Sequence, residues 1–155
     1  MAEEKDAAGV VAPPPVIFAV PLAAAVYENT SHAIPFATGP VAMFLGIAII
    51  VAGLFLFVAA VQQFKKAGTE VVPYRPTTAI IEVWPYSFSR NPIYLSMAIM
   101  YIGISLIFNT WWPIFLLPLV LLVIQRGVIL REEAYLTRKF GDTYLSYKQR
   151  VRRWF

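Results

Sequence analysis

One stretch of this sequence limits the fold more than any other. Residues 41–61, VAMFLGIAIIVAGLFLFVAAV, contain no charged side chain. A helix needs about 20 mostly apolar residues to cross a hydrocarbon core roughly 30 Å thick, so this run predicts a transmembrane helix. Its small residues Gly46, Ala48, Ala52 and Gly53 would let a neighbouring helix approach closely. The composition agrees, because 59% of the 155 residues are hydrophobic and only 14% are charged.

Three shorter apolar runs, residues 16–27, 92–108 and 111–124, predict further spans. Only Asn109 and Thr110 separate the last two, and so short a connection predicts an antiparallel helical hairpin. Beyond Gln125 the chain becomes charged but keeps helical spacing, which predicts that the last helix continues out of the membrane into water.

We therefore expect an all-α integral membrane protein with about four transmembrane helices in a single domain. Around the spans we expect a mobile tail over residues 1–12 and a proline-broken cytosolic interfacial segment over residues 67–91. A cytosolic helical segment should follow over residues 126–155, with Gly141 capping the end of one helix and Asp142 capping the start of the next.

The distribution of basic residues predicts the orientation. The 13 Lys and Arg residues lie in the N-terminal tail, in residues 65–90 and after residue 125. None lies in the loop of residues 28–40 or in the turn at residues 109–110. Since Lys and Arg favour the cytosolic side, both termini should be cytosolic, which requires an even number of spans.

The residue inventory excludes several classes of site. The sequence contains no cysteine, so it has no disulfide and no thiolate nucleophile. His32 is the single histidine, too few for the usual zinc sites or a histidine-based triad, so we expect no metal and treat His32 as an ordinary loop residue. The basic residues follow the ends of apolar segments and do not form the aromatic-lined surface that nucleic acids need, so we expect no nucleic-acid partner.

The predicted hairpin brings two polar regions together, residues 87–94 and residues 131–142. Arg90 precedes Asn91 and Pro92, so the proline can occupy the first helical turn while the free amides there face an anion. Glu132 and Glu133 should lie opposite. A ligand with both charges, such as S-adenosylmethionine, would suit these walls, and zwitterionic lipid head groups would suit them equally well.

At these residues the sequence resembles the superfamily of isoprenylcysteine carboxyl methyltransferases and phospholipid methyltransferases. The strings that carry the resemblance are Ser89-Arg90-Asn91-Pro92-Ile93-Tyr94-Leu95, Arg131-Glu132-Glu133-Ala134-Tyr135-Leu136, Phe140-Gly141-Asp142-Thr143-Tyr144 and Val151-Arg152-Arg153-Trp154-Phe155. The resemblance covers about the last 90 residues.

The resemblance implies a membrane-embedded methyltransferase of the isoprenylcysteine carboxyl methyltransferase type, with a phospholipid or small-thiol methyltransferase as the alternative, that holds S-adenosylmethionine in a cytosolic pocket. In agreement, the sequence has no glycine-rich strand-to-helix fingerprint of a soluble nucleotide-binding fold. Carried over by position, the expected cofactor-binding residues are Arg90, Asn91, Pro92, Tyr94, Glu132 and Glu133. Arg90, Glu132 and Glu133 are also the expected catalytic residues, and a lipophilic acceptor would approach from the bilayer.

The methyl acceptor is left open. Asn91 stands where prenylcysteine methyltransferases usually have His, and Trp84 and Ser87 depart from the usual Gly and Arg around Pro85 and Tyr86. A prenylated cysteine carboxylate, a phospholipid amine and a small thiol are the candidate acceptors. If the acceptor is an amine, Glu132 or Glu133 is the carboxylate positioned to accept a proton.

Other interpretations compete with this one. The protein could be a non-catalytic membrane scaffold, a transporter subunit or an oxidoreductase resembling the membrane sterol reductases. In those cases Arg90 and the glutamates could form a purely structural interhelical salt bridge. The remaining basic cluster, Lys148, Arg150, Arg152 and Arg153, is interpreted as an anchor for anionic lipids.

Overall fold

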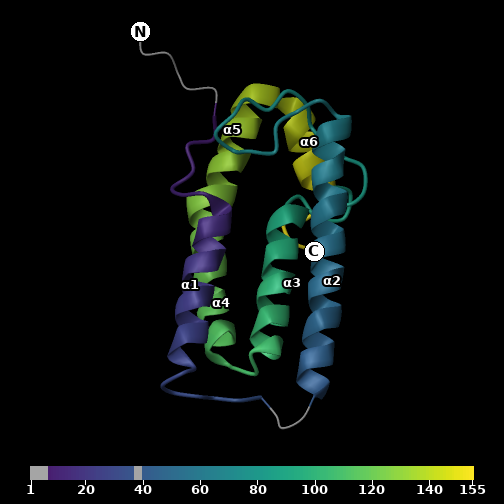
Figure 1. The fold of residues 1–155 in the computed structure, drawn as a ribbon. Coiled ribbons are helices and arrows are strands. Elements are labelled where there is room, and N and C mark those ends of the chain that lie inside the picture. Colours follow the sequence, from purple (N-terminus) through teal and green to yellow (C-terminus); the bar gives the residue numbers. More distant parts are fainter. Residues whose placement is uncertain (1–6, 37–39) are drawn as a thin grey trace.

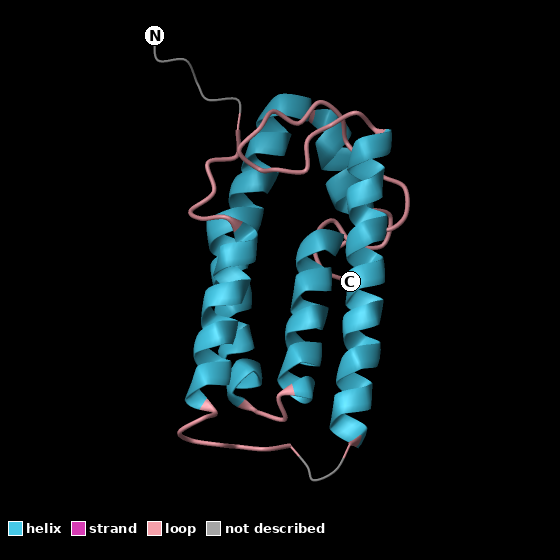
Figure 2. Ribbon diagram, in the orientation of Figure 1, coloured by secondary structure: helices cyan, strands magenta, loops and turns pink. Residues whose placement is uncertain are grey.

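The computed structural model describes residues 7–36 and 40–155, and all regular structure in these ranges is helical (Figure 1; Figure 2). The elements are α1 (Pro14–Glu28), α2 (Val41–Lys66), α3 (Pro92–Ile107), α4 (Trp112–Ile124), the π-helical turn η1 (Gln125–Ile129), α5 (Leu130–Phe140) and α6 (Asp142–Arg150). The expected all-α fold is confirmed for the described part of the chain. Residues 67–91, which contain Pro73, Pro76 and Pro85, form no helix, as expected.

Among the described residues, two helices are long and apolar enough to cross a membrane, α2 and the continuous helix Trp112–Phe140, which comprises α4, η1 and α5. The helices α1 and α3 are also apolar but have only 15 and 16 residues. At about 1.5 Å of rise per residue they extend over roughly 22–24 Å, less than a hydrocarbon core of roughly 30 Å. Length and composition therefore support two of the four expected spans.

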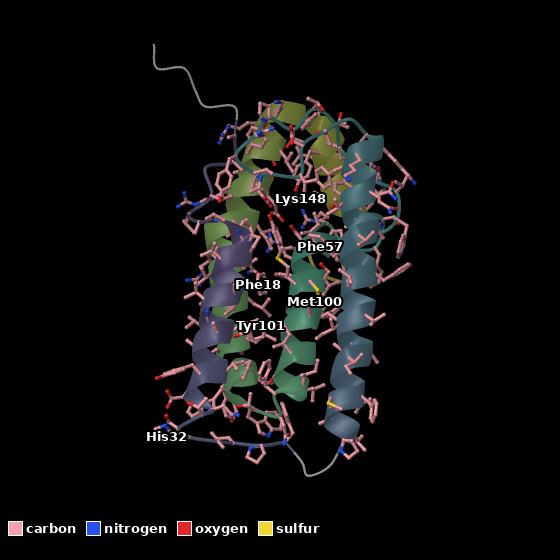
Figure 3. All side chains as sticks on the ribbon, in the orientation of Figure 1. Phe18, His32, Phe57, Met100, Tyr101 and Lys148 are labelled. Atoms are coloured by element: carbon pink, nitrogen blue, oxygen red, sulfur yellow. The ribbon has the colours of Figure 1, made fainter. Side chains whose placement is uncertain are left out.

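The centre of the bundle is α3, which packs against α1, α2 and α4 (Figure 1). Phe18 of α1 and Tyr101 of α3 meet in this core, with ring centroids 6.3 Å apart (Figure 3). The buried cluster continues into α4 and η1 through Ile124, Val128 and Ile129, none of which has measurable exposure. This apolar core fixes the position of α3 relative to the helix that carries the two glutamates.

Glycine lets α2 and α3 approach each other closely. A methyl group placed on Gly46 would lie 2.7 Å from the carbonyl oxygen of Gly103, and one on Gly103 would lie 2.8 Å from the carbonyl oxygen of Gly46. Gly53 also faces α3. Ala48 and Ala52, which sequence analysis grouped with these glycines, are exposed, so only half of that set forms the helix contact.

The bundle has two chemically different ends. At one end, the loop after α1 packs on the turn between α3 and α4, since Trp111 N donates to Ile34 O at 2.9 Å and Phe36 N donates to Asn109 Oδ1 at 3.0 Å. The other end carries residues 67–91, α5 and α6 (Figure 2). Figure 3 shows His32 at the first end and Lys148 at the second. The predicted hairpin of α3 and α4 is confirmed.

Part of the predicted mobile tail contacts the rest of the chain. Residues 1–6 of that tail lie outside the described residues, so the prediction is untested there. Ala8 N donates to Pro73 O at 3.2 Å and Val11 N donates to Gly127 O at 3.1 Å. The Val11 side chain packs against Gly127, whose missing side chain leaves room for it. Residues 8–11 are therefore anchored by backbone hydrogen bonds to the rest of the bundle.

The junction between α5 and α6 is close to the prediction. Gly141 ends α5 with a φ of 53°, a conformation that glycine adopts readily. Asp142 is predicted to cap the next helix, but Gly141 occupies the N-cap position, and Asp142 is the first residue of α6 and makes no capping hydrogen bond. The helix α2 extends to Lys66, five residues beyond the uncharged run, because the Gln and Lys residues there are good helix formers.

Candidate active site

A cavity opens at the basic end of the bundle, between the interfacial segment, the start of α3 and the helix α5. It encloses about 130 Å³ of space for the centres of water molecules, well above the roughly 10–15 Å³ that one water needs. Its lining includes all six predicted site residues, Arg90, Asn91, Pro92, Tyr94, Glu132 and Glu133. The structure therefore brings the two predicted polar regions together around one pocket.

The π-helical turn η1 lies directly before the glutamates. It interrupts the helix between α4 and α5, and Gly127, Val128 and Ile129 are buried within it. A π turn adds a residue to one helical turn, so it changes which face of the following helix points inward. Such turns are frequent at functional sites, and here the glutamates follow in the first turn of α5. The helical spacing of the sequence predicts a continuous α-helix here, so the π-helical turn is a departure from it.

Glu133 is surrounded by three cations. Arg153 Nε and Nη2 lie 2.8 and 2.9 Å from its two carboxylate oxygens, a two-point contact. Arg90 Nη1 and Lys148 Nζ each lie 3.3 Å from the same carboxylate. The side chains of Arg90 and Glu133 are 8% and 7% exposed, whereas those of Arg153 and Lys148 are 29% and 38% exposed. Glu133 is therefore an ionised centre that holds α5, α6 and the C-terminal residues together.

Glu132 has a different environment. Tyr94 donates its hydroxyl hydrogen to Glu132 Oε1 at 2.6 Å, which joins α3 to α5. Within residues 7–36 and 40–155, no Lys or Arg forms an ion pair with Glu132. The sequence predicts one wall formed by both glutamates, but the structure distinguishes Glu133, whose charge is neutralised by cations, from Glu132, which forms no ion pair with a described residue.

Several hydrogen-bond donors in the pocket are unused. Arg90 Nε and Nη1 are buried and make no hydrogen bond to any described residue, and the ion pair with Glu133 at 3.3 Å lacks hydrogen-bond geometry. The Tyr86 hydroxyl is likewise buried without a partner in the described chain. Buried polar groups are normally satisfied, so these donors mark where a polar ligand group would bind.

Asn91 and Pro92 position α3. Pro92 starts the helix, as predicted, and Asn91 occupies the residue before it. The Asn91 side-chain amide donates to Arg153 O at 2.9 Å and its backbone N–H donates to Ser89 Oγ at 3.2 Å. The Asn91 amide group is therefore used to hold the C-terminal residues, although the residue also borders the pocket.

The pocket lining also includes tyrosines that the prediction did not, among them Tyr86, Tyr144 and Tyr147. Tyr147 donates to Tyr86 O at 2.8 Å. Burial raises the pKa of all three phenols, that of Tyr144 to about 12, where the Glu133 charge raises the pKa further and Arg90 opposes it. All three phenols therefore stay protonated near neutral pH. Tyr144 and Tyr147, three residues apart on α6, were visible in the sequence as one helix face.

Three of the four basic residues interpreted as a lipid anchor form ion pairs within the protein, and the anchor itself stays a prediction. Lys148 and Arg153 pair with Glu133, and Arg150 pairs with Glu82. Arg152 is exposed. The sequence of a basic run does not show which of its charges are solvated and which pair with a distant carboxylate.

A comparison with protein families identifies the fold family of this site. The phospholipid methyltransferase family matches residues 41–143, about two thirds of the chain. The chain belongs to this family. The matched region includes Arg90, Tyr94, Glu132 and Glu133, and the resemblance to the wider superfamily with isoprenylcysteine carboxyl methyltransferases is thereby confirmed. The phospholipid methyltransferase family consists of membrane methyltransferases, consistent with the two long apolar helices.

Other relatives add little to the family assignment. An uncharacterized protein of Haemophilus influenzae is 62% identical to this chain over 34 residues. The aligned stretch covers 22% of this chain and 54% of that protein, so the chain spans about half the length of the curated relative it matches. No solved structure matches the chain.

Proposed function

We propose that this phospholipid methyltransferase family member transfers a methyl group from S-adenosylmethionine to the amine head group of a membrane lipid. The observation that supports this acceptor is Glu132, a carboxylate that borders the pocket, accepts a hydrogen bond from Tyr94 and forms no ion pair among the described residues. A carboxylate or thiolate acceptor is already deprotonated and needs no base, whereas an ammonium group must lose a proton first. The carboxylate acceptor of a prenylated cysteine would leave Glu132 without that role.

The pocket residues fit the chemistry of S-adenosylmethionine. The unused Arg90 Nε and Nη1 donors suit a carboxylate, and the buried Tyr86 hydroxyl can donate to a further polar group. The unpaired charge of Glu132 and the faces of Tyr144 and Tyr147 suit positively charged groups. When bound, this cofactor supplies an electrophilic methyl group on a sulfonium sulfur.

Glu132 would act as the proton acceptor. An ammonium nitrogen has no lone pair, so it becomes a nucleophile only after one proton passes to a Glu132 carboxylate oxygen. The C–N bond then forms as the S–C bond breaks, and the bonding electron pair remains on the departing sulfur. Tyr94 would keep the carboxylate oriented through its 2.6 Å hydrogen bond. The pocket wall includes buried tyrosine and proline side chains, and a ligand that displaces water from it would strengthen these electrostatic contacts.

We further propose that all four apolar helices, α1 to α4, cross the membrane and that the pocket faces the cytosol. The loop after α1 and the turn between α3 and α4 lie at one end without Lys or Arg, while most of the basic residues lie at the pocket end. By the positive-inside rule, that end is cytosolic. A lipid head group at this interface would reach the pocket while its acyl chains stay in the bilayer.

The test is methyl transfer from tritiated S-adenosylmethionine into a total lipid extract by the detergent-purified protein. Label in an amine-bearing lipid that survives mild base supports the proposal. Label released as volatile methanol by mild base would indicate a carboxyl methyl ester, and the amine acceptor would then be wrong. Absence of any transfer, with no binding of S-adenosylmethionine, would overturn the methyltransferase proposal. A Glu82→Gln variant, altered in an exposed ion pair outside the pocket, is the matched control for a Glu132→Gln variant.

A further inference from the structure

The last five residues, 151–155, run from α6 back to the start of α3, and we call them the C-terminal clasp. Val151 has an extended backbone, which ends α6 and directs the chain toward α3. Arg90 N donates to Arg152 O at 3.0 Å, Asn91 Nδ2 donates to Arg153 O at 2.9 Å and Ser89 Oγ donates to the same oxygen at 3.3 Å. The clasp is thus bound by three consecutive residues that lead into α3.

The side chains of the clasp reach the opposite wall of the pocket. Arg153 makes its two-point contact with Glu133 of α5 at 2.8 and 2.9 Å. Trp154 Nε1 donates to Gln125 Oε1, in the π-helical turn η1, at 3.2 Å. The clasp therefore connects the start of α3 to the helix that carries Glu132 and Glu133.

Charge balance around Glu133 indicates what this connection does. One carboxylate faces three cations, Arg90, Lys148 and Arg153, so not all of them can be fully neutralised. Arg153 takes the shortest contacts to both oxygens, in the planar two-point geometry that arginine favours. Arg90 is left at 3.3 Å with two buried donors unused. Without Arg153, the carboxylate would attract the Arg90 guanidinium and occupy those donors.

We propose that Arg153 is a positioning residue, which holds Glu133 so that Arg90 keeps its donors directed toward a carboxylate of the ligand in the pocket. This inference rests on the proposed function for the identity of that ligand, S-adenosylmethionine. Neither Arg153 nor any other clasp residue borders the pocket, and the family match ends at residue 143, before the clasp begins. The clasp therefore acts through Glu133 and Arg90 and makes no contact with the ligand itself.

The experiment compares Arg153→Gln and Arg153→Lys with Arg152→Gln in the detergent-purified full chain. Arg152 is the matched control because it is the adjacent arginine, its side chain is exposed, and the clasp uses only its backbone carbonyl. Equilibrium binding of tritiated S-adenosylmethionine should weaken about tenfold or more in Arg153→Gln. Arg90 would then pair with Glu133, and its charge-assisted contact with the ligand carboxylate would be lost. Arg153→Lys keeps the charge but loses the two-point geometry, so it should fall between Arg153→Gln and wild type. Arg152→Gln should bind like wild type.

A second measurement does not depend on the ligand. Amide hydrogen exchange over residues 87–94 should become faster in Arg153→Gln and remain unchanged in Arg152→Gln, because the Arg90 amide is bonded to the clasp. If the wild type fails to bind S-adenosylmethionine while this exchange pattern holds, the proposed function fails and the connection made by the clasp stands. Unchanged exchange in Arg153→Gln would overturn the connection, and unchanged ligand binding would overturn the positioning role.

A double variant separates positioning from a general loss of folding. If Arg153 acts through Glu133, adding Arg153→Gln to Glu133→Gln should change the binding of S-adenosylmethionine less than twofold further. A further loss as large as that of Arg153→Gln alone would show that Arg153 acts independently of Glu133, and the proposal would be wrong.

Discussion

Two adjacent glutamates of α5, Glu132 and Glu133, lie in different electrostatic environments. Glu133 lies among three cations, whereas Glu132 accepts a hydrogen bond from Tyr94 and has no cationic partner in the described residues. Consecutive residues on a helix point about 100° apart, so neighbours in sequence can face different surroundings. At the scale of the residue, this difference supports the proposed chemical role of Glu132 and predicts a structural role for Glu133.

Substitution by glutamine should separate the two roles. Glu132→Gln removes the proposed proton acceptor, so kcat for methyl transfer to an amine should fall about 100-fold or more. Thermal unfolding of that variant should stay close to wild type because no ion pair is lost. Radiometric assays with purified protein measure the rate, and a Glu132→Gln variant with full activity toward an amine would contradict the assigned role.

Glu133→Gln should instead reduce stability. It leaves Arg90, Lys148 and Arg153 without a counter-charge, at a cost of about 2 kcal/mol. This is less than the roughly 3–5 kcal/mol for breaking a fully buried pair, because Arg153 and Lys148 remain partly solvated. Thermal unfolding in detergent, monitored by circular dichroism, measures the change. A melting temperature equal to that of wild type would show that the cluster contributes nothing to the fold.

At the scale of the element, the close packing of α2 on α3 positions the pocket wall. Gly46 and Gly103 bring the two backbones so near that a side chain on either would meet a carbonyl oxygen within 2.8 Å. Backbone atoms cannot move aside as a flexible side chain can. The start of α3, with Arg90 and Tyr94, is therefore held by a helix contact that depends on residues without side chains.

Gly46→Ala should lower the melting temperature by roughly 3–10 °C, the effect of about 1–3 kcal/mol of overpacking in a chain of this size. Ala52→Leu is the matched control, since Ala52 lies on the same helix with its side chain exposed. Unfolding in the same detergent compares the two variants. An Ala52→Leu effect as large as that of Gly46→Ala would mean that the exposed face of α2 is also packed.

At the scale of the whole molecule, the two ends of the bundle differ in charge. The end formed by the loop after α1 and by the turn between α3 and α4 has no Lys or Arg, whereas the other end holds the pocket and its ionic cluster. This asymmetry predicts that Ser31 is outside the cytosol and Ser146 inside.

Because the chain has no cysteine, a single introduced one reports its own location. In intact cells, a membrane-impermeant maleimide should label Ser31→Cys at once, and it should label Ser146→Cys only after permeabilisation. Both positions are exposed, so access to the reagent is matched. Labelling of both variants from outside would contradict cytosolic termini and an even number of spans.

The features that the sequence predicts correctly are local or periodic. The uncharged run of residues 41–61, the two-residue turn at Asn109 and Thr110 and the distribution of Lys and Arg predicted the helices, the hairpin and the charge of each end. They did so because helix formation and membrane burial depend on neighbours within a few turns. The hairpin was enough to bring Arg90 and Tyr94 beside Glu132 and Glu133.

Only the tertiary structure decided how the charges in the pocket are shared. Arg153 contacts Glu133, which is 20 residues away in the sequence, and the start of α3, which is more than 60 residues away. Residues 8–11 contact Pro73 and Gly127, which are also more than 60 residues away. A periodic pattern in the sequence cannot predict such contacts, because they join segments that are distant along the chain. For the same reason, the sequence could not separate Glu132 from Glu133: their partners come from elements that are distant along the chain and adjacent only after folding.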